Sequence, residues 1–89
     1  MVVVKRLVLD VLKPHLPNSL DFSCTLAQVG SDYHVSLTVL EMDEKTESIE
    51  IEIEGSNLDL AAIQSAIEDM SGSLHSIDFV EVQSEPDKE

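Results

Sequence analysis

The sequence contains few of the residues that several common functions require. Of its 89 residues, 5 are Lys or Arg and 18 are Asp or Glu, which gives a formal net charge of −13. Nucleic acids and anionic membrane surfaces are bound through clustered basic side chains. The scarcity of positive charge therefore argues against both kinds of partner. Divalent cations, basic partners or a high-salt environment fit this composition better.

Cysteine, aromatic residues and long apolar runs are also scarce. Cys24 is the one cysteine, so an intrachain disulfide and a multi-cysteine metal site are both excluded. We expect Cys24 to be a small buried residue of a helix. With no Trp, one Tyr and two Phe, the core must be aliphatic. No apolar run approaches the length of a membrane-spanning helix, and the N-terminal charge order is the reverse of a signal peptide. We expect a cytoplasmic protein.

What the sequence does contain is clear hydrophobic periodicity. Residues 49–54 alternate Ile and Glu with the period of a β-strand that is buried on one face. Further strands are predicted over residues 3–12, 33–42 and 74–83. One helix is expected from Asn18 or Ser19 to Gly30 and another from Asp59 to Gly72. Residues 1–83 are thus predicted to form a single domain, and residues 84–89 a disordered acidic tail.

The predicted element order is βαββαβ, which is typical of the ferredoxin-like α+β fold. This fold is a four-stranded antiparallel sheet, here with strands in the order 4-1-3-2, that carries both helices on one face. Pairing Val39 with Ile51 and Leu37 with Ile53 keeps the apolar side chains of the middle hairpin together. On the last strand, alternation places Ile77 and Phe79 toward the helices.

Three carboxylates are predicted to converge on the sheet face that the helices leave open. Asp10, Glu50 and Asp78 lie near a common end of three adjacent strands, where their charges repel unless a cation relieves them. An oxygen-only cluster suits Ca²⁺ or Mg²⁺. His15, Glu47 and His75 are second-line candidates, with His75 expected to be half-buried. The alternative is a solvated acidic face on which Arg6 pairs locally.

The same open face is predicted to carry apolar side chains among its charges. Exposed apolar residues on a helix-free face indicate a protein contact, and a second copy of the chain is the most common partner. The expected interface residues are Val8, Leu12, Leu40, Met42, Val80 and Val82.

Two motifs resemble a known family. Residues 6–15, Arg-Leu-Val-Leu-Asp-Val-Leu-Lys-Pro-His, and 75–78, His-Ser-Ile-Asp, are similar to an archaeal family of uncharacterised proteins, domain-of-unknown-function family 211. Glu54-Gly55 and the segment 67–70 before Gly72 add to the match. The resemblance implies a ferredoxin-like fold that forms homo-oligomers, plausibly rings, with divalent cation binding as a further property and no established activity. The acidic excess suits a salt-loving archaeon.

These observations leave three functions open. The first is a small non-enzymatic oligomer that binds a divalent cation or a small regulatory ligand on its acidic sheet face. The second is a self-assembly or protein-interaction module without a ligand. The third is an acid–base enzyme that uses His75 with Asp78 or Asp10, which has the least support because the sequence shows no nucleophile or cofactor motif.

Overall fold

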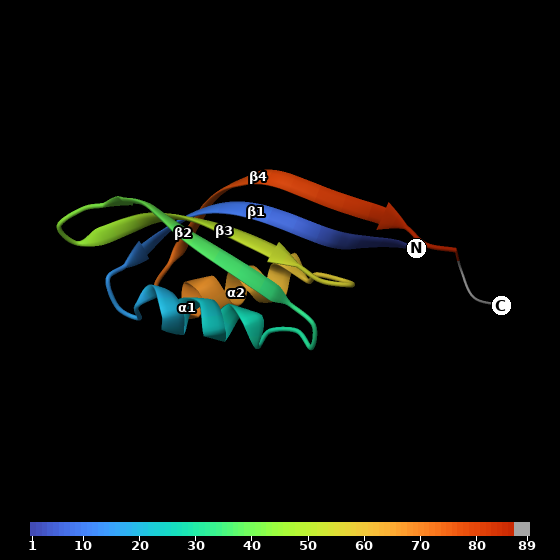
Figure 1. Ribbon diagram of the computed structural model, residues 1–89, viewed down its shortest axis with the longest axis horizontal. Coiled ribbons are helices and arrows are strands. Elements are labelled where there is room, and N and C mark those ends of the chain that lie inside the picture. Colours follow the sequence, from blue (N-terminus) through green and yellow to red (C-terminus); the bar gives the residue numbers. More distant parts are fainter. Residues whose placement is uncertain (87–89) are drawn as a thin grey trace.

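The computed structural model describes residues 1–86 and has the predicted ferredoxin-like α+β architecture (Figure 1). The sheet order is β2-β3-β1-β4, and all neighbouring strands are antiparallel, which confirms the predicted topology. The elements follow one another as β1 (Val2–Pro14), α1 (Ser19–Ala27), β2 (His34–Met42), β3 (Thr46–Glu54), α2 (Leu60–Asp69) and β4 (Ser73–Ser84).

The core lies between the helices and one face of the two central strands. In β1 and β3 the apolar residues recur at every second position, so that one face of each strand is buried. In the β1–β3 register, Leu7 is opposite Ile53 and Leu9 is opposite Ile51. The two helices cover this face with a few side chains each, and the buried cluster comprises Leu7, Leu9, Val11, Phe22, Leu26, Ile49, Ile51, Ile53, Leu58, Ile63 and Ile67.

Both helices begin at the predicted caps. The Asn18 side chain accepts a hydrogen bond from the Asp21 amide, and the Asp59 side chain accepts one from the Ala62 amide. The helices end earlier than predicted, at Ala27 and Asp69. Cys24, expected to be buried, is exposed, because the buried side of α1 is formed by Phe22 and Leu26.

The turn after α2 uses a serine where glycine was expected. Ser71 adopts φ 66°, whereas no glycine among the described residues has a positive φ. Gly72 serves close packing instead, because a Cβ at this position would lie 2.9 Å from Ile67 Cγ2 and 3.1 Å from the Ile67 carbonyl oxygen. The strand β4 can therefore begin directly against the end of the helix.

The predicted pairing of β2 with β3 is wrong by two residues. Leu37 lies opposite Ile51 rather than Ile53, and Val39 lies opposite Ile49 rather than Ile51. A shift of two preserves the buried face, which is why apolar patterning alone could not reveal it. An irregularity between Val39 and Glu41 then breaks the alternation, so that Met42 pairs with the buried Glu47 and lies on the helix side.

A second irregularity, at Asp78, reverses the predicted faces of β4 from Phe79 onward, whereas Ile77 lies toward the helices as predicted. Phe79 pairs with Val8, Ile77 pairs with Leu9, and Asp78 between them has no partner in the register. Directly opposed residues share a face of the sheet, so Phe79 lies on the open face and not toward the helices. Val80 pairs with Leu7 and Val82 with Val4, which places both valines on the helix side. Alternation predicted the opposite because it does not anticipate bulges.

The molecule is elongated, with principal extents of 54 × 22 × 17 Å. The β2–β3 turn lies at one end, and the N-terminus and the end of β4 lie at the other, where β1 and β4 extend past the helices (Figure 1). Among residues 1–86, no helix has the length and apolar character needed to cross a membrane. Ser84 is the last residue of β4 and the Glu85 amide donates to the Met1 carbonyl, while residues 87–89 of the predicted tail lie outside the described residues.

Candidate functional site

Two of the three predicted carboxylates lie side by side on the open face. Asp10 is directly opposite Glu50 in the β1–β3 register. Asp10 is partly exposed and Glu50 is exposed. Neither carboxylate makes a hydrogen bond or an ion pair with any of residues 1–86. The pair is therefore an uncompensated double negative charge on neighbouring strands, an arrangement that is unfavourable without a counter-ion.

Asp78 does not complete this pair into a cluster. The residue opposite Asp10 on β4 is Ser76, and the Ser76 hydroxyl donates a hydrogen bond of 2.7 Å to the Asp78 carboxylate. Among residues 1–86, no group of three His, Cys, Asp or Glu side chains is arranged to hold a metal ion. A cation at Asp10 and Glu50 would need its remaining oxygen ligands from water or from another molecule.

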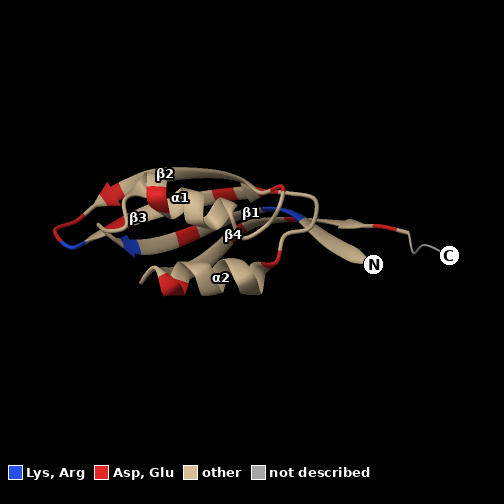
Figure 2. Cartoon of the chain, turned by 90° about the horizontal axis from the view of Figure 1, so that it is seen from below, with Lys and Arg blue, Asp and Glu red and all other residues tan. Residues whose placement is uncertain are grey.

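Arg6 provides the local pairing that the alternative reading expected. Its guanidinium forms an ion pair with Glu52 and lies 5.1 Å from the centre of the Phe79 ring. Arg6 is thus paired with Glu52 and not with Asp10 or Glu50. Among residues 1–86, the basic residues lie in β1 and in the turn after β2, whereas acidic residues are spread over the strands, helices and loops (Figure 2).

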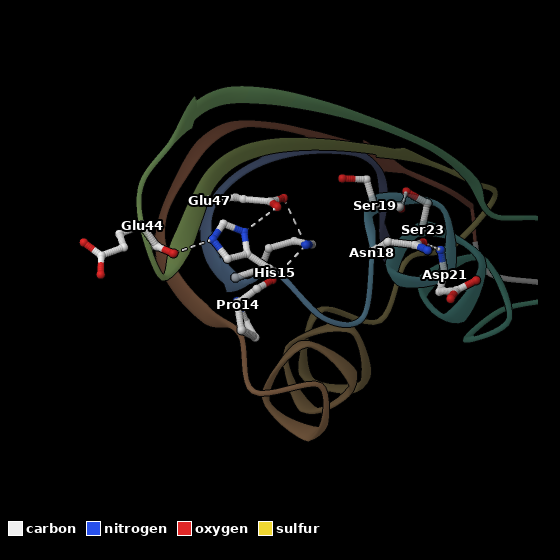
Figure 3. Close-up of polar contacts among 9 residues, drawn as sticks. Pro14, His15, Asn18, Ser19, Asp21, Ser23, Glu44 and Glu47 are labelled. Carbon is white, nitrogen blue, oxygen red and sulfur yellow. Dashed lines mark hydrogen bonds and ion pairs between the residues drawn. The ribbon is translucent and has the colours of Figure 1, made fainter.

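The most highly connected polar cluster joins β1, β3 and the loop after β1. The Lys13 ammonium is fully buried and donates to Glu47 Oε1 at 3.0 Å and to the Pro14 carbonyl at 2.8 Å. Glu47 Oε2 lies 2.9 Å from His15 Nδ1, and His15 Nε2 lies 2.9 Å from the Glu44 carbonyl oxygen (Figure 3). We call Lys13, His15 and Glu47 the buried-lysine cluster.

Both ring nitrogens of His15 face acceptors, so the doubly protonated imidazolium satisfies this geometry best. The pKa of His15 is raised above its ordinary value of 6.5 by the hydrogen bond to the Glu47 carboxylate and then by the Glu44 carbonyl. The pKa of Glu47 is lowered from its ordinary value of 4.5 by the hydrogen bonds from His15 and from Lys13. The cluster ties the loop after β1 to the β2–β3 turn.

Sequence reasoning named His15 and Glu47 but missed Lys13. The signal was present in the alternation of β1, because the buried series that includes Leu9 and Val11 continues at Lys13. The buried series of β3 likewise begins at Glu47, two residues before Ile49. Two opposite charges at the ends of two buried rows on adjacent strands predict a buried ion pair.

The other histidines form no such network. His75 was expected to be half-buried, but it is exposed, because the shift between Asp10 and Val11 leaves it out of the β1–β4 register. It makes no side-chain hydrogen bond within residues 1–86, and Asp10 is opposite Ser76 rather than His75. No pocket is present in the described part of the chain. The geometry therefore gives no support to an acid–base pair that involves His75.

Comparison with known proteins identifies the family. Residues 5–85 match the family model of domain-of-unknown-function family 211, which is described as uncharacterized ArCR. The chain is also 44% identical over 77 residues to an uncharacterized protein of Methanocaldococcus jannaschii, a match that covers 86% of this chain and 79% of that protein. The chain belongs to domain-of-unknown-function family 211.

The family assignment confirms the resemblance found in the sequence, and its description names no ligand, activity or assembly. In this member of family 211, the features that bear on function are the Asp10–Glu50 pair on the open face, the buried-lysine cluster and the two edge strands, β2 and β4.

The buried-lysine cluster predicts an asymmetric response to mutation. We expect Glu47→Leu to lower the free energy of unfolding by about 3–5 kcal/mol, because it leaves the Lys13 ammonium buried without a carboxylate. The double variant Lys13→Met with Glu47→Leu should recover most of that loss, since it removes both charges. Urea unfolding followed by circular dichroism measures both. Glu44→Gln is the control, because Glu44 contacts His15 through its carbonyl. Equal stability of Glu47→Leu and the wild type would contradict the prediction.

The same cluster predicts a pH dependence. The raised pKa of His15 contributes stability that is fully present below pH 6.5 and is lost as the pH rises through the folded-state pKa. The lowered pKa of Glu47 contributes stability that is present above pH 4.5 and is lost as the pH falls through its folded-state value. Thermal unfolding at fixed protein concentration should therefore show a plateau between these limits. His15→Gln should remove the decline above pH 6.5, and an unchanged decline in this variant would count against the cluster.

Proposed function

We propose that this protein is a non-enzymatic, self-associating protein whose sheet makes the contact between copies. The observation that supports this most is the set of large apolar side chains exposed on both edge strands, with exposed fractions from 39% to 64%. They are Val39, Leu40 and Met42 in β2, and Ile77, Phe79, Val80 and Val82 in β4. Large apolar side chains exposed along the edge strands of a sheet favour a protein contact.

The size of the chain supports the same proposal. An 89-residue chain buries one modest aliphatic core, and small domains of this kind gain stability when they associate. Of the interface residues proposed from the sequence, Val8 and Leu12 are partly buried on the open face. Leu40, Met42, Val80 and Val82 are exposed by 55% or more and lie on the two edge strands. The edges of the sheet therefore make a stronger case than the middle of its open face.

The mass of the protein in solution tests self-association. We expect analytical ultracentrifugation at micromolar concentration to give a whole-number multiple of the 9.8 kDa chain, two or greater. The measurement should be repeated with EDTA, which separates assembly through side chains from assembly that needs a cation. A mass of one chain under both conditions would refute the proposal.

A second proposal, that the open face binds a divalent cation, is supported by the Asp10–Glu50 pair. These carboxylates face one another without a positive partner among residues 1–86. If the face is covered in an assembly, the pair loses solvent screening and the repulsion grows, so a hard cation with oxygen ligands becomes the natural counter-charge. Carboxylates from a neighbouring copy could complete the coordination shell. Such a cation would be structural.

Calorimetric titration with Ca²⁺ and with Mg²⁺ tests this second proposal. We expect saturable binding to the wild type and at least tenfold weaker binding to Asp10→Asn and to Glu50→Gln. The control is Glu68→Gln, which removes an exposed carboxylate from α2 and should bind like the wild type. Equal loss of binding in all three variants would indicate diffuse attraction to an acidic surface and would eliminate the site.

A further inference from the structure

His15 is the member of the buried-lysine cluster that reaches solvent. Its side chain is 39% exposed, whereas the side chains of Lys13 and Glu47 are 0% and 8% exposed. A proton can therefore enter and leave the imidazole ring while the Lys13–Glu47 pair stays shielded from water.

The imidazole connects two segments that the strand pairing leaves unconnected at this end of the sheet. The last pair in the β1–β3 register is Pro14 with Thr46, so residues 43–45 of the β2–β3 turn lie past the paired strands, and all three are exposed. His15 Nε2 lies 2.9 Å from the Glu44 carbonyl oxygen (Figure 3). This hydrogen bond ties the turn to the loop after β1.

The charged groups that face His15 come from the two central strands. Glu47 of β3 lies 2.9 Å from the ring, and Lys13 of β1 donates to the other oxygen of the same carboxylate at 3.0 Å. The turn contributes the backbone groups of Asp43 and Glu44, and the Glu44 carboxylate points away from the ring (Figure 3). Together these partners raise the pKa of His15, so the imidazolium persists at pH values above 6.5.

The imidazolium and the neutral imidazole differ in what they can bind at this position. The imidazolium has two N–H groups, so it donates to Glu47 Oε2 through Nδ1 and to the Glu44 carbonyl through Nε2. The neutral ring has one N–H and one lone pair. After deprotonation, one of the two acceptors must therefore lose its donor and face a lone pair instead.

The Glu47 carboxylate is the stronger of the two acceptors. A hydrogen bond to an ionised group is roughly twice as strong as one between neutral groups. Glu47 is also held by Lys13, and at 8% exposure it has little water to replace the imidazole. Glu44 is an exposed residue, so water can replace His15 at its carbonyl at little cost. The bond to Glu44 is the one that deprotonation breaks.

From these contacts we infer that His15 forms a pH-dependent link between the loop after β1 and the β2–β3 turn. The imidazolium binds both segments. When Nε2 gives its proton to water, the ring keeps its Nδ1–H bond to Glu47 and the turn is released, while the Lys13–Glu47 pair persists. The turn also keeps its internal hydrogen bond, in which the Asp43 amide donates to the Thr46 carbonyl at 2.8 Å, and it moves as a unit.

The released segment continues into the exposed end of β2. Regular pairing of β2 with β3 ends at Val39, where an irregularity begins. Beyond it lie Leu40 and Met42, with exposed fractions of 60% and 64%. Deprotonation of His15 thus loosens the turn and the apolar end of β2 together, so pH sets how rigidly these side chains are displayed.

The tautomer of the neutral ring tests the inference in the unmodified protein. Two-dimensional ¹H–¹⁵N spectra of the imidazole rings, recorded across a pH titration, distinguish the imidazolium from the Nδ1–H and Nε2–H forms. We expect neutral His15 to carry its proton on Nδ1, and the exposed His75 is the internal reference. A proton on Nε2 would show that the bond to Glu44 is retained and would overturn the inference, even if no variant of His15 folds.

Backbone dynamics test the release of the turn. We expect the ¹⁵N order parameters of residues 40–45 to fall as the pH rises through the His15 midpoint, with those of residues 49–53 unchanged. In His15→Gln the side chain does not titrate, so this step should vanish. The matched control is His34→Gln, which removes an exposed histidine from the other end of β2 and should retain the step.

Each other outcome contradicts the link. Order parameters that stay constant through the His15 midpoint mean that the turn is not released. An equal fall in residues 49–53 means that the whole sheet loosens, which contradicts a local release. A step that survives in His15→Gln assigns the effect to another group. The measured contacts lie within one chain, so these outcomes are separate from those that test self-association.

Discussion

The structure depends on the antiparallel pairing of β1 with β3. This pairing aligns two rows of aliphatic side chains, Leu7, Leu9 and Val11 against Ile53, Ile51 and Ile49, and the helices pack on the surface that the rows form. Every other element is placed by reference to it, since β2 joins β3 and β4 joins β1. The face opposite these rows receives the alternate residues, and for that reason Asp10 meets Glu50 there.

The buried-lysine cluster follows from the same pairing. One step beyond the last aliphatic pair in each row, Lys13 stands opposite Glu47, so the core ends in an ion pair rather than in another apolar contact. A buried ion pair adds little net stability compared with an apolar pair, but it is costly to break. Its role here is to position neighbouring segments of the chain. Glu47 hydrogen-bonds to His15, and His15 hydrogen-bonds to the carbonyl of Glu44, so the β2–β3 turn is fixed against the loop that follows β1.

The acidic charge and the exposed apolar residues are distributed differently, and this difference underlies the proposed functions. Glu50, Glu52 and Glu54 of β3 lie in the middle of the open face, where Arg6 neutralises Glu52 while Glu50 faces Asp10. Apart from Val2 at the start of β1, the large exposed apolar residues of the strands lie on the two outer strands, β2 and β4. The charged residues of the central strands suit the proposed cation, and the apolar residues of the edge strands suit the proposed contact between copies.

The sequence by itself determined the element order, the sheet topology, the helix caps and the buried faces of β1 and β3, because these depend on local periodicity and on capping residues such as Asn18 and Asp59. It also placed Asp10 beside Glu50, since both lie on regular strands. The tertiary structure decided the faces of Met42, Phe79 and Val80, and the separation of Asp78 from Asp10. Irregularities after Val39 and around Asp78 displace the alternation there, and a bulge is set by pairing and twist between strands rather than by the residues of one strand. The burial of Lys13 was likewise decided by the tertiary structure, because the pairing of β1 with β3 supplies the Glu47 carboxylate that makes this burial favourable.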